Sequence, residues 1–254
     1  MRILILSDIH ANITGLDASL AAAEGRWDRA VCLGDLVGYG PDPNEATDCI
    51  RPLVTCVIRG NHDKACSGIS NAEDFNPVAR TAAMWTRENL TPENLKYLQE
   101  LPMGPLETEG LTLIHGALRD EDEYVFAPAQ ALDGLLGAPT QVSFFGHTHF
   151  QGGFSFRNNQ IEVIELDPAP PAGAEPGGAA HALLKIDPAT RYLLNPGSTG
   201  QPRDGDPRAG FAIADLVHNA VEFWRVPYGI EAVQRRMLHA GLPEPLALRL
   251  AFGR

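Results

Sequence analysis

Five apolar segments with the character of β-strands are each followed at once by a short block of polar residues. Five of the eight histidines lie in these blocks, together with aspartate, asparagine or glycine. Because ligands of open α/β sheets bind just beyond the carboxyl ends of strands, this arrangement predicts one polar site at the edge of a sheet. The blocks are Ser7-Asp8-Ile9-His10, Gly34-Asp35, Gly60-Asn61-His62-Asp63, His115-Gly116 and Gly146-His147-Thr148-His149.

The N-terminal part of the chain alternates between strand-like and helix-like patterns. An apolar run at Arg2–Leu6 is followed by Asn12, a suitable N-cap for a helix whose apolar residues recur at helical spacing. Further strands are predicted at 30–33 and 54–58, with a short helix over 43–51 between them. This β-α-β-α-β order predicts parallel strands joined by crossover helices.

The rest of the chain continues the alternation and then turns to strands. Residues 76–101 have helical periodicity, with a restart where Thr91-Pro92 supplies a cap and a proline at the first helical position. Strands are predicted at 111–114 and 142–145, with a helix over 128–136 between them. Later strands at short intervals predict a second, mostly antiparallel sheet packed on the first. These later strands are expected at 160–166, 181–186, 192–194, 211–216 and 220–226.

Two segments interrupt or follow these strands. Residues 167–180 are rich in proline and glycine, which do not pack a core, so we expect a mobile surface loop with strands of one sheet on both sides. Residues 231–254 predict two short helices broken at Gly241-Leu242-Pro243. We expect the 254 residues to form a single domain.

Charge and composition restrict the partners of this chain. Its net charge of −12 disfavours long nucleic acid, whereas a small phosphate ligand is still allowed because bound metals reverse the local field. The N-terminal apolar run is too short for a signal peptide, and no stretch approaches the roughly 20 apolar residues that span a bilayer. The four cysteines lack a Cys-x-x-Cys spacing. We therefore expect reduced thiols in a cytoplasmic protein without a membrane partner, either a monomer or a homodimer.

The residue types in the blocks are those that bind divalent transition metals. Asp8 and His10 are two residues apart at a strand end, as are His147 and His149, so the members of each pair can project to the same side. Asn61 adds a neutral oxygen ligand. Mixed imidazole, carboxylate and amide ligation suits Mn, Fe, Zn, Co or Ni better than Ca or Mg, and the absence of cysteine argues against a closed structural zinc site. Two pockets sharing one carboxylate would hold two metals, which can clamp the oxygens of a phosphoryl transfer.

In order and placement, the blocks resemble the five motifs of the calcineurin-like metallophosphoesterases. Those motifs are Asp-x-His, Gly-Asp, Gly-Asn-His-(Asp/Glu), His and Gly-His-x-His, and the matches span Asp8 to His149. The sequences Gly-Asp-Leu-Val-Gly-Tyr-Gly-Pro at 34–41 and Asn-Pro-Gly-Ser at 195–198 are typical of the small bacterial phosphodiesterase branch. The resemblance implies an α/β fold, a two-sheet β-sandwich of mixed sheets flanked by helices, with a short C-terminal helical tail.

The resemblance also implies a role for each block. One metal ion would be held by Asp8, His10, Asp35 and His149, and the second by Asp35, Asn61, His115 and His147, with Asp35 bridging the two. Manganese is favoured, with Fe, Zn, Co or Ni as alternatives. His62, beside the metals but not bound to them, would protonate the leaving oxygen, a task suited to a side chain that titrates near neutral pH.

One departure from the superfamily limits what is implied. Protein serine/threonine phosphatases of this superfamily carry Gly-Asp-x-x-Asp-Arg-Gly, in which the later aspartate orients the catalytic histidine and the arginine grips phosphate. Gly38 and Tyr39 occupy those positions here. Protein phosphatase activity is therefore not implied. The residue that orients His62 is not identified by the sequence, since Asp63 at a strand end can point away.

Three residues outside the motifs are candidates for substrate contact. Asn12 could reach the phosphate, although capping a helix is the favoured interpretation. Tyr39 could stack on a base or cover the site, or be an ordinary loop aromatic. Arg203 could approach the phosphate, or form an exposed ion pair with Asp204 in a turn. The acidic run at 120–123 is expected to be a solvated loop.

These observations favour the hydrolysis of phosphodiesters by a metal-bridging hydroxide, with Asp35 bridging the metals and His62 as the general acid. The expected partner is a small phosphate ester. A phosphomonoesterase and a dinucleoside polyphosphate hydrolase are the alternatives within the same class. A non-catalytic metal-binding scaffold is the alternative from another class, and the complete set of ligand positions counts against it.

Overall fold

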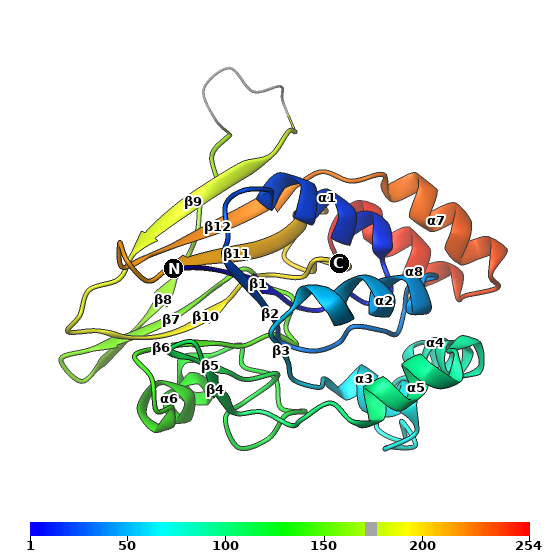
Figure 1. Ribbon diagram of the computed structural model, residues 1–254, viewed down its shortest axis with the longest axis horizontal. Helices are drawn as coiled ribbons and strands as arrows, with labels where there is room; N and C mark the ends of the chain where they lie inside the picture. The colour runs from blue at the N-terminus through cyan, green and yellow to red at the C-terminus, as the bar shows by residue number, and fades with distance from the viewer. Residues whose placement is uncertain (171–176) are drawn as a thin grey trace.

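Two mixed six-stranded sheets lie face to face in the computed structural model, which describes residues 1–170 and 177–254 (Figure 1). The predicted two-sheet α/β fold is confirmed. The first sheet runs in the order β3 (Cys56–Val57), β2 (Arg29–Cys32), β1 (Arg2–Leu6), β11 (Ala209–Asp215), β12 (Ala220–Val226) and β9 (Ala180–Lys185). The second runs in the order β4 (Leu106–Thr108), β5 (Leu111–Leu113), β6 (Val142–Phe144), β10 (Arg191–Asn195), β7 (Gly152–Arg157) and β8 (Gln160–Ile164).

Helices flank the two sheets and begin at residues suited to cap them. Asn12, Asn76 and Thr91 each accept a hydrogen bond from a backbone N–H in the first turn of the helix that follows. No helix in the described part of the chain could traverse a bilayer. The helices are α1 (Ile13–Ala23), α2 (Pro43–Leu53), α3 (Asn61–Ser67), α4 (Pro77–Asn89), α5 (Pro92–Gln99), α6 (Pro128–Gly137), α7 (Ile230–His239) and α8 (Glu244–Arg249), followed by a short 3₁₀ turn, η1 (Leu250–Phe252).

Each sheet contains a parallel group that ends at the predicted site. Strands β1, β2 and β3 are parallel in the first sheet, and β5, β6 and β10 are parallel in the second. Strand β1 completes its pairing with β11, which runs antiparallel to it and leads on to β12 and β9. The polar blocks follow the carboxyl ends of β1, β2, β3, β5 and β6, as the sequence predicts.

Two expectations about the later strands are wrong. They do not form a sheet of their own, because β9, β11 and β12 extend the first sheet while β7, β8 and β10 belong to the second. A sheet edge left unpaired is a liability, and β11 covers the edge of β1 that the parallel crossover leaves open. The strands on either side of the proline- and glycine-rich segment therefore lie in different sheets. Residues 171–176 of that segment lie outside the described residues.

Three elements were missed by sequence analysis. Strand β7 begins with Gly152-Gly153, which lowers strand propensity, yet a Cβ at Gly153 would lie only 2.3 Å from the backbone oxygen of Leu193. Strand β4 is only three residues long. Helix α3 begins inside the third polar block, where Asp63 accepts a hydrogen bond from the N–H of Gly60. The block therefore follows a strand and also starts a helix.

The alternation of side chains along β1 divides the interior into two cores. Ile3 and Ile5 face the second sheet and pack with residues such as Phe144 and Phe223. Leu4 and Leu6 face the other way and pack beneath the helices. All four cysteines are free thiols.

The two C-terminal helices occur as predicted, with the break between α7 and α8 at residues 240–243. Their apolar side chains, among them Val233, Met237 and Leu246, pack in one cluster with Tyr39. This cluster brings the end of the described chain beside the loop that follows β2. The tail therefore adjoins the predicted site.

Replacing Phe223 should test the core between the sheets. Its side chain is fully buried there, so Phe223→Ala should lower the free energy of unfolding by about 3–5 kcal/mol. Thermal unfolding should shift downward by roughly 2–4 °C per kcal/mol for a chain of this size. The control is Phe252→Ala, whose ring is 65% exposed and should change stability little. Equal shifts in both variants would contradict this assignment of the core.

Candidate metal centre

The loops after the parallel strands are hydrogen-bonded to one another in pairs. The N–H of Asp8 donates to the oxygen of Gly34 at 3.0 Å, and the N–H of His10 donates to the oxygen of Asp35 at 2.9 Å. In the second sheet, the N–H of Gly146 donates to the oxygen of His115 at 2.8 Å. These contacts bring side chains from five polar blocks into one buried region.

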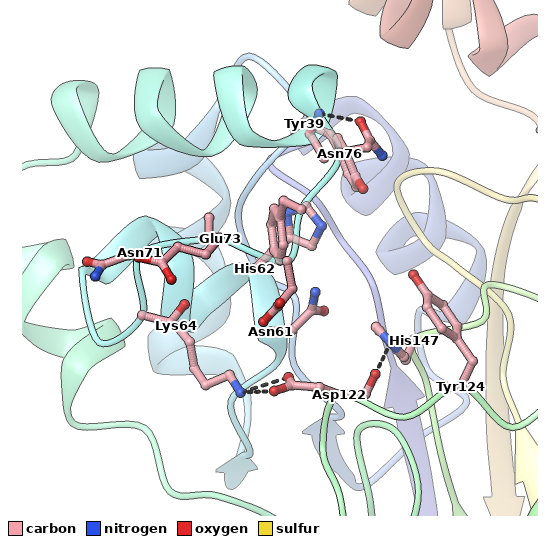
Figure 2. Close-up of a pocket in the computed structure, with 15 residues that line it drawn as sticks. Tyr39, Asn61, His62, Lys64, Asn71, Glu73, Asn76, Asp122, Tyr124 and His147 are labelled. Atoms are coloured by element: carbon pink, nitrogen blue, oxygen red, sulfur yellow. Dashed lines mark hydrogen bonds and ion pairs between the residues drawn. The ribbon is translucent and has the colours of Figure 1, made fainter.

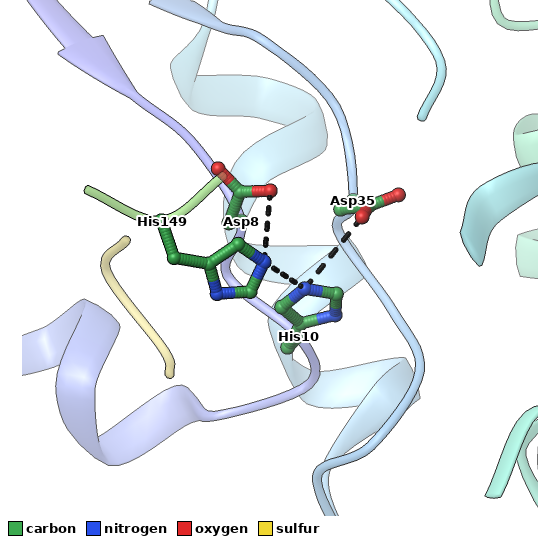
Figure 3. A group of neighbouring side chains, drawn as sticks. All are labelled: Asp8, His10, Asp35 and His149. Atoms are coloured by element: carbon green, nitrogen blue, oxygen red, sulfur yellow. Dashed lines mark hydrogen bonds and ion pairs between the residues drawn. The ribbon is translucent and has the colours of Figure 1, made fainter. Parts of the chain in front are cut away.

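Asp8, His10, Asp35 and His149 form the first cluster (Figure 3). The Nε2 atom of His149 lies 3.3 Å from Oδ1 of Asp8 and 3.1 Å from Nε2 of His10. The other ring nitrogen of each histidine lies against a backbone carbonyl, at 3.1 Å for His10 and 2.6 Å for His149. A carbonyl accepts only, so each Nδ1 carries the proton, and two unprotonated Nε2 atoms face one another.

The second cluster contains Asp35, His115 and His147. Nε2 of His115 lies 3.5 Å from Oδ2 of Asp35 and 3.4 Å from Oδ1 of Asn61, while its Nδ1 donates to a backbone carbonyl. His147 has the opposite arrangement, because its Nε2 donates to the oxygen of Asp122 at 3.1 Å and leaves Nδ1 as the free lone pair. Four candidate ligands thus surround a second position.

Asp35 is common to both clusters. Its Oδ1 accepts a hydrogen bond from the N–H of His62 at 2.9 Å. Its Oδ2 is buried and has no hydrogen-bond partner among the described residues. That atom lies 3.6 Å from Nε2 of His10 in the first cluster and 3.5 Å from Nε2 of His115 in the second. Asp35 therefore belongs to both groups of side chains that could hold a metal ion.

The donor set fits two divalent ions. Ligands bound at about 2.1 Å to one ion are separated by roughly 3.0–3.5 Å in tetrahedral or octahedral arrangements, which matches the spacing of these atoms. Burial raises the pKa of Asp8 to about 6, against the opposing influence of His115. Burial also lowers the pKa of His10 and of His149 well below the usual range. His115 differs, because the charge of Asp35 outweighs burial and raises the pKa of this imidazole to about 10. Without a metal, its imidazolium balances the buried carboxylate of Asp35, and a bound cation would take the place of its proton.

The backbone of the loops is strained where the ligands project. A left-handed residue other than glycine costs about 1–2 kcal/mol, and such strain concentrates at functional sites. Gly60 shows how close the approach is, because a Cβ there would lie 2.0 Å from Oδ1 of Asp35. The candidate ligands with positive φ are Asp8 at 51°, His10 at 48°, Asp35 at 52°, His147 at 64° and His149 at 62°.

The segment at 195–198 braces the loops of both sheets. The side chain of Asn195 donates to the oxygen of Gly146 and to the hydroxyl of Thr148, at 3.0 Å each. The hydroxyl of Ser198 donates to the backbone oxygen of Asp8 at 2.7 Å. This segment therefore fixes the first and last ligand loops relative to one another.

His62 lies beside the two clusters on the first turn of α3. Its ring centroid is 4.2 Å from that of Tyr39 and 4.6 Å from that of Phe75. Its Nδ1 has no partner among the described residues and faces Gly38, where a Cβ would lie 2.5 Å away. Burial lowers the pKa of His62 to about 4, although Asp35 opposes this shift. Aromatic packing, and no carboxylate, sets the orientation of this ring.

Asp63 does not orient His62. Its two carboxylate oxygens accept hydrogen bonds from the backbone N–H groups of Gly60 and Val37, at 2.9 and 3.3 Å. The carboxylate thus joins the start of α3 to the loop after β2. Its role is to place the helix that carries Asn61 and His62.

The three candidate substrate residues are placed differently. The side-chain oxygen of Asn12 accepts a hydrogen bond from the N–H of Gly15, and its nitrogen donates to the oxygen of Gly200. These contacts are those expected of a residue that caps a helix. Tyr39 lies against the ring of His62 and lines the adjacent cavity. Arg203 lies over the ring of Tyr39, with its Cζ 5.5 Å from the centroid, and does not pair with Asp204.

A cavity of about 400 Å³ opens beside the clusters (Figure 2). Asn61, His62 and His147 lie on one side of it, and the loop between α3 and α4 lies on the other. Tyr124, which the sequence did not single out, stacks on the ring of His147 with centroids 3.8 Å apart. Nothing in the pattern around Tyr124 connects it with a histidine that follows a later strand.

The acidic run at 120–123 is only partly solvated, contrary to expectation. Glu121 pairs with Arg59 and Lys64 at 2.9 Å each, and Asp122 pairs with Lys64 at 2.6 Å. These ion pairs fix the loop whose carbonyl at Asp122 accepts from His147. The run therefore supports a candidate ligand through its backbone.

Comparison with known proteins agrees with this geometry. A family model described as the calcineurin-like phosphoesterase superfamily domain matches residues 1–219. An uncharacterized protein of Methanocaldococcus jannaschii is 31% identical over 99% of this chain and 98% of its own length.

Two solved structures extend the comparison. A metallophosphoesterase from Sphaerobacter thermophilus is 39% identical, with a TM-score of 0.82 over 100% of this chain and 99% of that one. A hypothetical protein of Pyrococcus horikoshii shares the fold, with a TM-score of 0.77 at 19% identity over 100% of this chain and 98% of its own. The family match over most of the chain, together with two clusters that could hold metals, shows that the protein belongs to the calcineurin-like phosphoesterase superfamily.

Proposed function

We propose that the protein is a dinuclear metal-dependent phosphodiesterase that acts on small phosphate esters. The observation that carries the proposal is the position of the Asp35 Oδ2 atom, which is buried, lacks a hydrogen-bond partner among the described residues and lies between the imidazoles of His10 and His115 in the two clusters. Manganese is the favoured metal, because hard carboxylate and amide oxygens are combined with imidazole.

Seven side chains would hold the metal pair, and Asp35 would be common to both ions. Bound in this way, two divalent ions supply a water of lowered pKa and positive charge for the phosphoryl oxygens. The backbone carbonyls that accept from the histidines fix each ring in the tautomer that presents a lone pair. The proposed ligands are Asp8, His10, Asp35, Asn61, His115, His147 and His149.

His62 is proposed as the proton donor to the leaving oxygen. Because its Nδ1 faces Gly38, we assign the proton to be given to Nε2 of this ring, which lines the cavity. With a pKa of about 4 the ring is neutral at pH 7. An anionic phosphate beside it would raise this pKa, so that the ring takes up a proton from water, passes it to the leaving oxygen and returns to its neutral form. Tyr39 and Phe75 hold the ring in place and exclude water from it.

The residue types favour a diester over a phosphoprotein. The positions that hold an orienting aspartate and a phosphate-gripping arginine in related protein phosphatases are Gly38 and Tyr39. The cavity beside His62 leaves room for the departing alcohol of a diester. The net charge of −12 disfavours a long nucleic acid as the substrate.

A substrate panel tests the proposal directly. Protein purified without chelator should contain two metal ions per chain and should hydrolyse a model diester faster than the matching monoester or a dinucleoside polyphosphate. Chelation should abolish turnover, and readdition of manganese should restore it. A metal-loaded protein that hydrolyses none of these esters would instead support a non-catalytic scaffold.

Loss of His62 should separate proton donation from metal binding. His62→Ala should retain two metal ions per chain, because the ring is not a ligand in the proposal. Turnover of a diester with a poor alkyl leaving group should fall by about 10²–10⁴, the usual contribution of a general acid. Turnover with a p-nitrophenyl leaving group should fall much less. The control is the exposed His239→Ala, and loss of metal in the His62 variant would contradict the assigned role.

Metal stoichiometry should reveal which carboxylate is shared. Asp35→Asn removes a charged oxygen from both clusters, so both ions should be weakly held after dialysis. Asp8→Asn affects one cluster, so about one ion per chain should remain. Elemental analysis of the two variants measures this difference directly. Loss of a single ion from the Asp35 variant would show that the clusters do not share that side chain.

Glu121 offers a test at a distance from the metals. Glu121→Gln weakens the ion pairs that hold the Asp122 carbonyl against His147, so affinity for the second ion should fall by roughly 10–100-fold. Affinity for the first ion should stay the same. The exposed neighbour Glu123→Gln is the matched control, and calorimetric titration of manganese measures both sites. An equal effect of the two substitutions would contradict the role of Glu121 in holding the Asp122 carbonyl against His147.

A further inference from the structure

Two arginines lie over the same aromatic ring at the edge of the metal centre. The Cζ atoms of Arg203 and Arg249 are 5.5 and 5.7 Å from the centroid of Tyr39. The same ring lies 4.7 Å from that of His10 and 4.2 Å from that of His62. A pair of positive charges therefore adjoins the histidines of the site.

Neither arginine pairs with an aspartate or glutamate side chain among the described residues. The side chain of Arg203 donates to Gln201 at 3.0 Å, and its Nε is buried without a partner. The side chain of Arg249 donates to the backbone oxygen of Arg254. Three other arginines do pair with aspartates, Arg208 with Asp206, Arg225 with Asp204 and Arg236 with Asp42. The partly buried Arg191 instead donates to three backbone carbonyls.

The arrangement of the pair is unfavourable as it stands. Burial, together with the charge of Arg203, lowers the pKa of Arg249 to about 10. Two neighbouring guanidinium groups with unused donors are suited to an oxyanion, which they can bind through several charge-assisted hydrogen bonds. Both side chains remain partly exposed, so a ligand can reach them.

We propose that Arg203 and Arg249 form a subsite for a second phosphate group, so that the preferred substrate is a phosphodiester that carries an additional terminal phosphate. This inference rests on the proposed phosphodiesterase function. The subsite is separate from the metal ligands, because the arginine side chains make no hydrogen bond with any of the proposed ligands in the described structure. It is adjacent to them through Tyr39.

A count of charges supports the binding of a second phosphate in addition to the one that reacts. Two divalent ions carry four positive charges, and the carboxylates of Asp8 and Asp35 neutralise two of them. The remaining two match a singly charged diester and its nucleophile. No aspartate or glutamate side chain among the described residues pairs with the two arginines, and a terminal phosphate supplies about −1.5 to −2 at pH 7.

The C-terminal helices place Arg249 in this subsite. Leu246, Ala247 and Leu250, on either side of it, pack in the cluster that contains Tyr39. The helical tail is thereby fixed against the loop after β2, with Arg249 directed over the ring. The tail would contribute to specificity without touching the metals.

A matched pair of substrates tests the subsite in the metal-loaded protein. Thymidine 5′-(p-nitrophenyl phosphate) is compared with the same compound bearing a 3′-phosphate. The wild-type protein should prefer the 3′-phosphorylated compound by at least about tenfold in kcat/KM, because each charge-assisted hydrogen bond contributes more than a tenfold factor. Arg249→Gln should remove this preference through KM and leave the simpler diester within about threefold. Arg235→Gln, which alters an exposed arginine of α7, should keep the preference.

A second readout does not depend on turnover. In the metal-free protein, titration with inorganic pyrophosphate should shift the NMR signal of the Arg203 Nε–H and saturate, and Arg249→Gln should weaken this binding at least tenfold. No saturable shift, or an equal loss with both thymidine substrates, would overturn the subsite. Saturable pyrophosphate binding by a protein that hydrolyses no ester would retain the subsite and reject the phosphodiesterase function.

Discussion

The rest of the site depends on the contacts that the buried carboxylate of Asp35 makes with both of its oxygens. One of its oxygens accepts from the backbone of His62 and so fixes the first turn of α3. The other lies between the imidazoles of the two clusters. A carboxylate buried in this way is costly unless positive charge lies beside it, and in the metal-free protein that charge is the His115 imidazolium, whose pKa Asp35 raises to about 10 against the effect of burial. The cations that satisfy Asp35 would therefore also hold the two sheets' loops together.

The fold holds the loops that carry the candidate ligands in strained backbone conformations. Five candidate ligands adopt left-handed backbone conformations, which isolated loops would not hold. Hydrogen bonds between neighbouring loops and the brace formed by Asn195 and Ser198 over-determine these conformations. The side chains are therefore placed before any ion arrives, and binding does not have to supply the energy that orders the loops.

The sequence allowed prediction of those parts of the site that follow from local order. Strand ends are marked by apolar runs and by glycine, so the placement of Asp8, Asp35 and His115 at the carboxyl ends of strands could be predicted, although the strands belong to two sheets. The surroundings of His62 could not, because Gly38 and Phe75 act through packing that leaves no pattern. The partners of Glu121 were missed because charge alone does not reveal that Arg59 and Lys64 lie nearby. The tail was recognised as helical, but its amphipathic pattern does not say which loop it covers.

Several of the residues that could not be predicted from the sequence lie around Tyr39, at a position where related protein phosphatases have a charged residue. Where those enzymes place an aspartate and an arginine within the second motif, this chain has Gly38 and Tyr39, so the motif itself carries no charged group toward the substrate. Tyr39 instead provides a flat surface against which His62 packs and over which Arg203 and Arg249 lie. In the proposed subsite, positive charge for an anionic ligand would thus come from segments distant in the sequence. Because those segments lie outside the five motifs, a substitution in them would alter contacts with the substrate without replacing a proposed metal ligand.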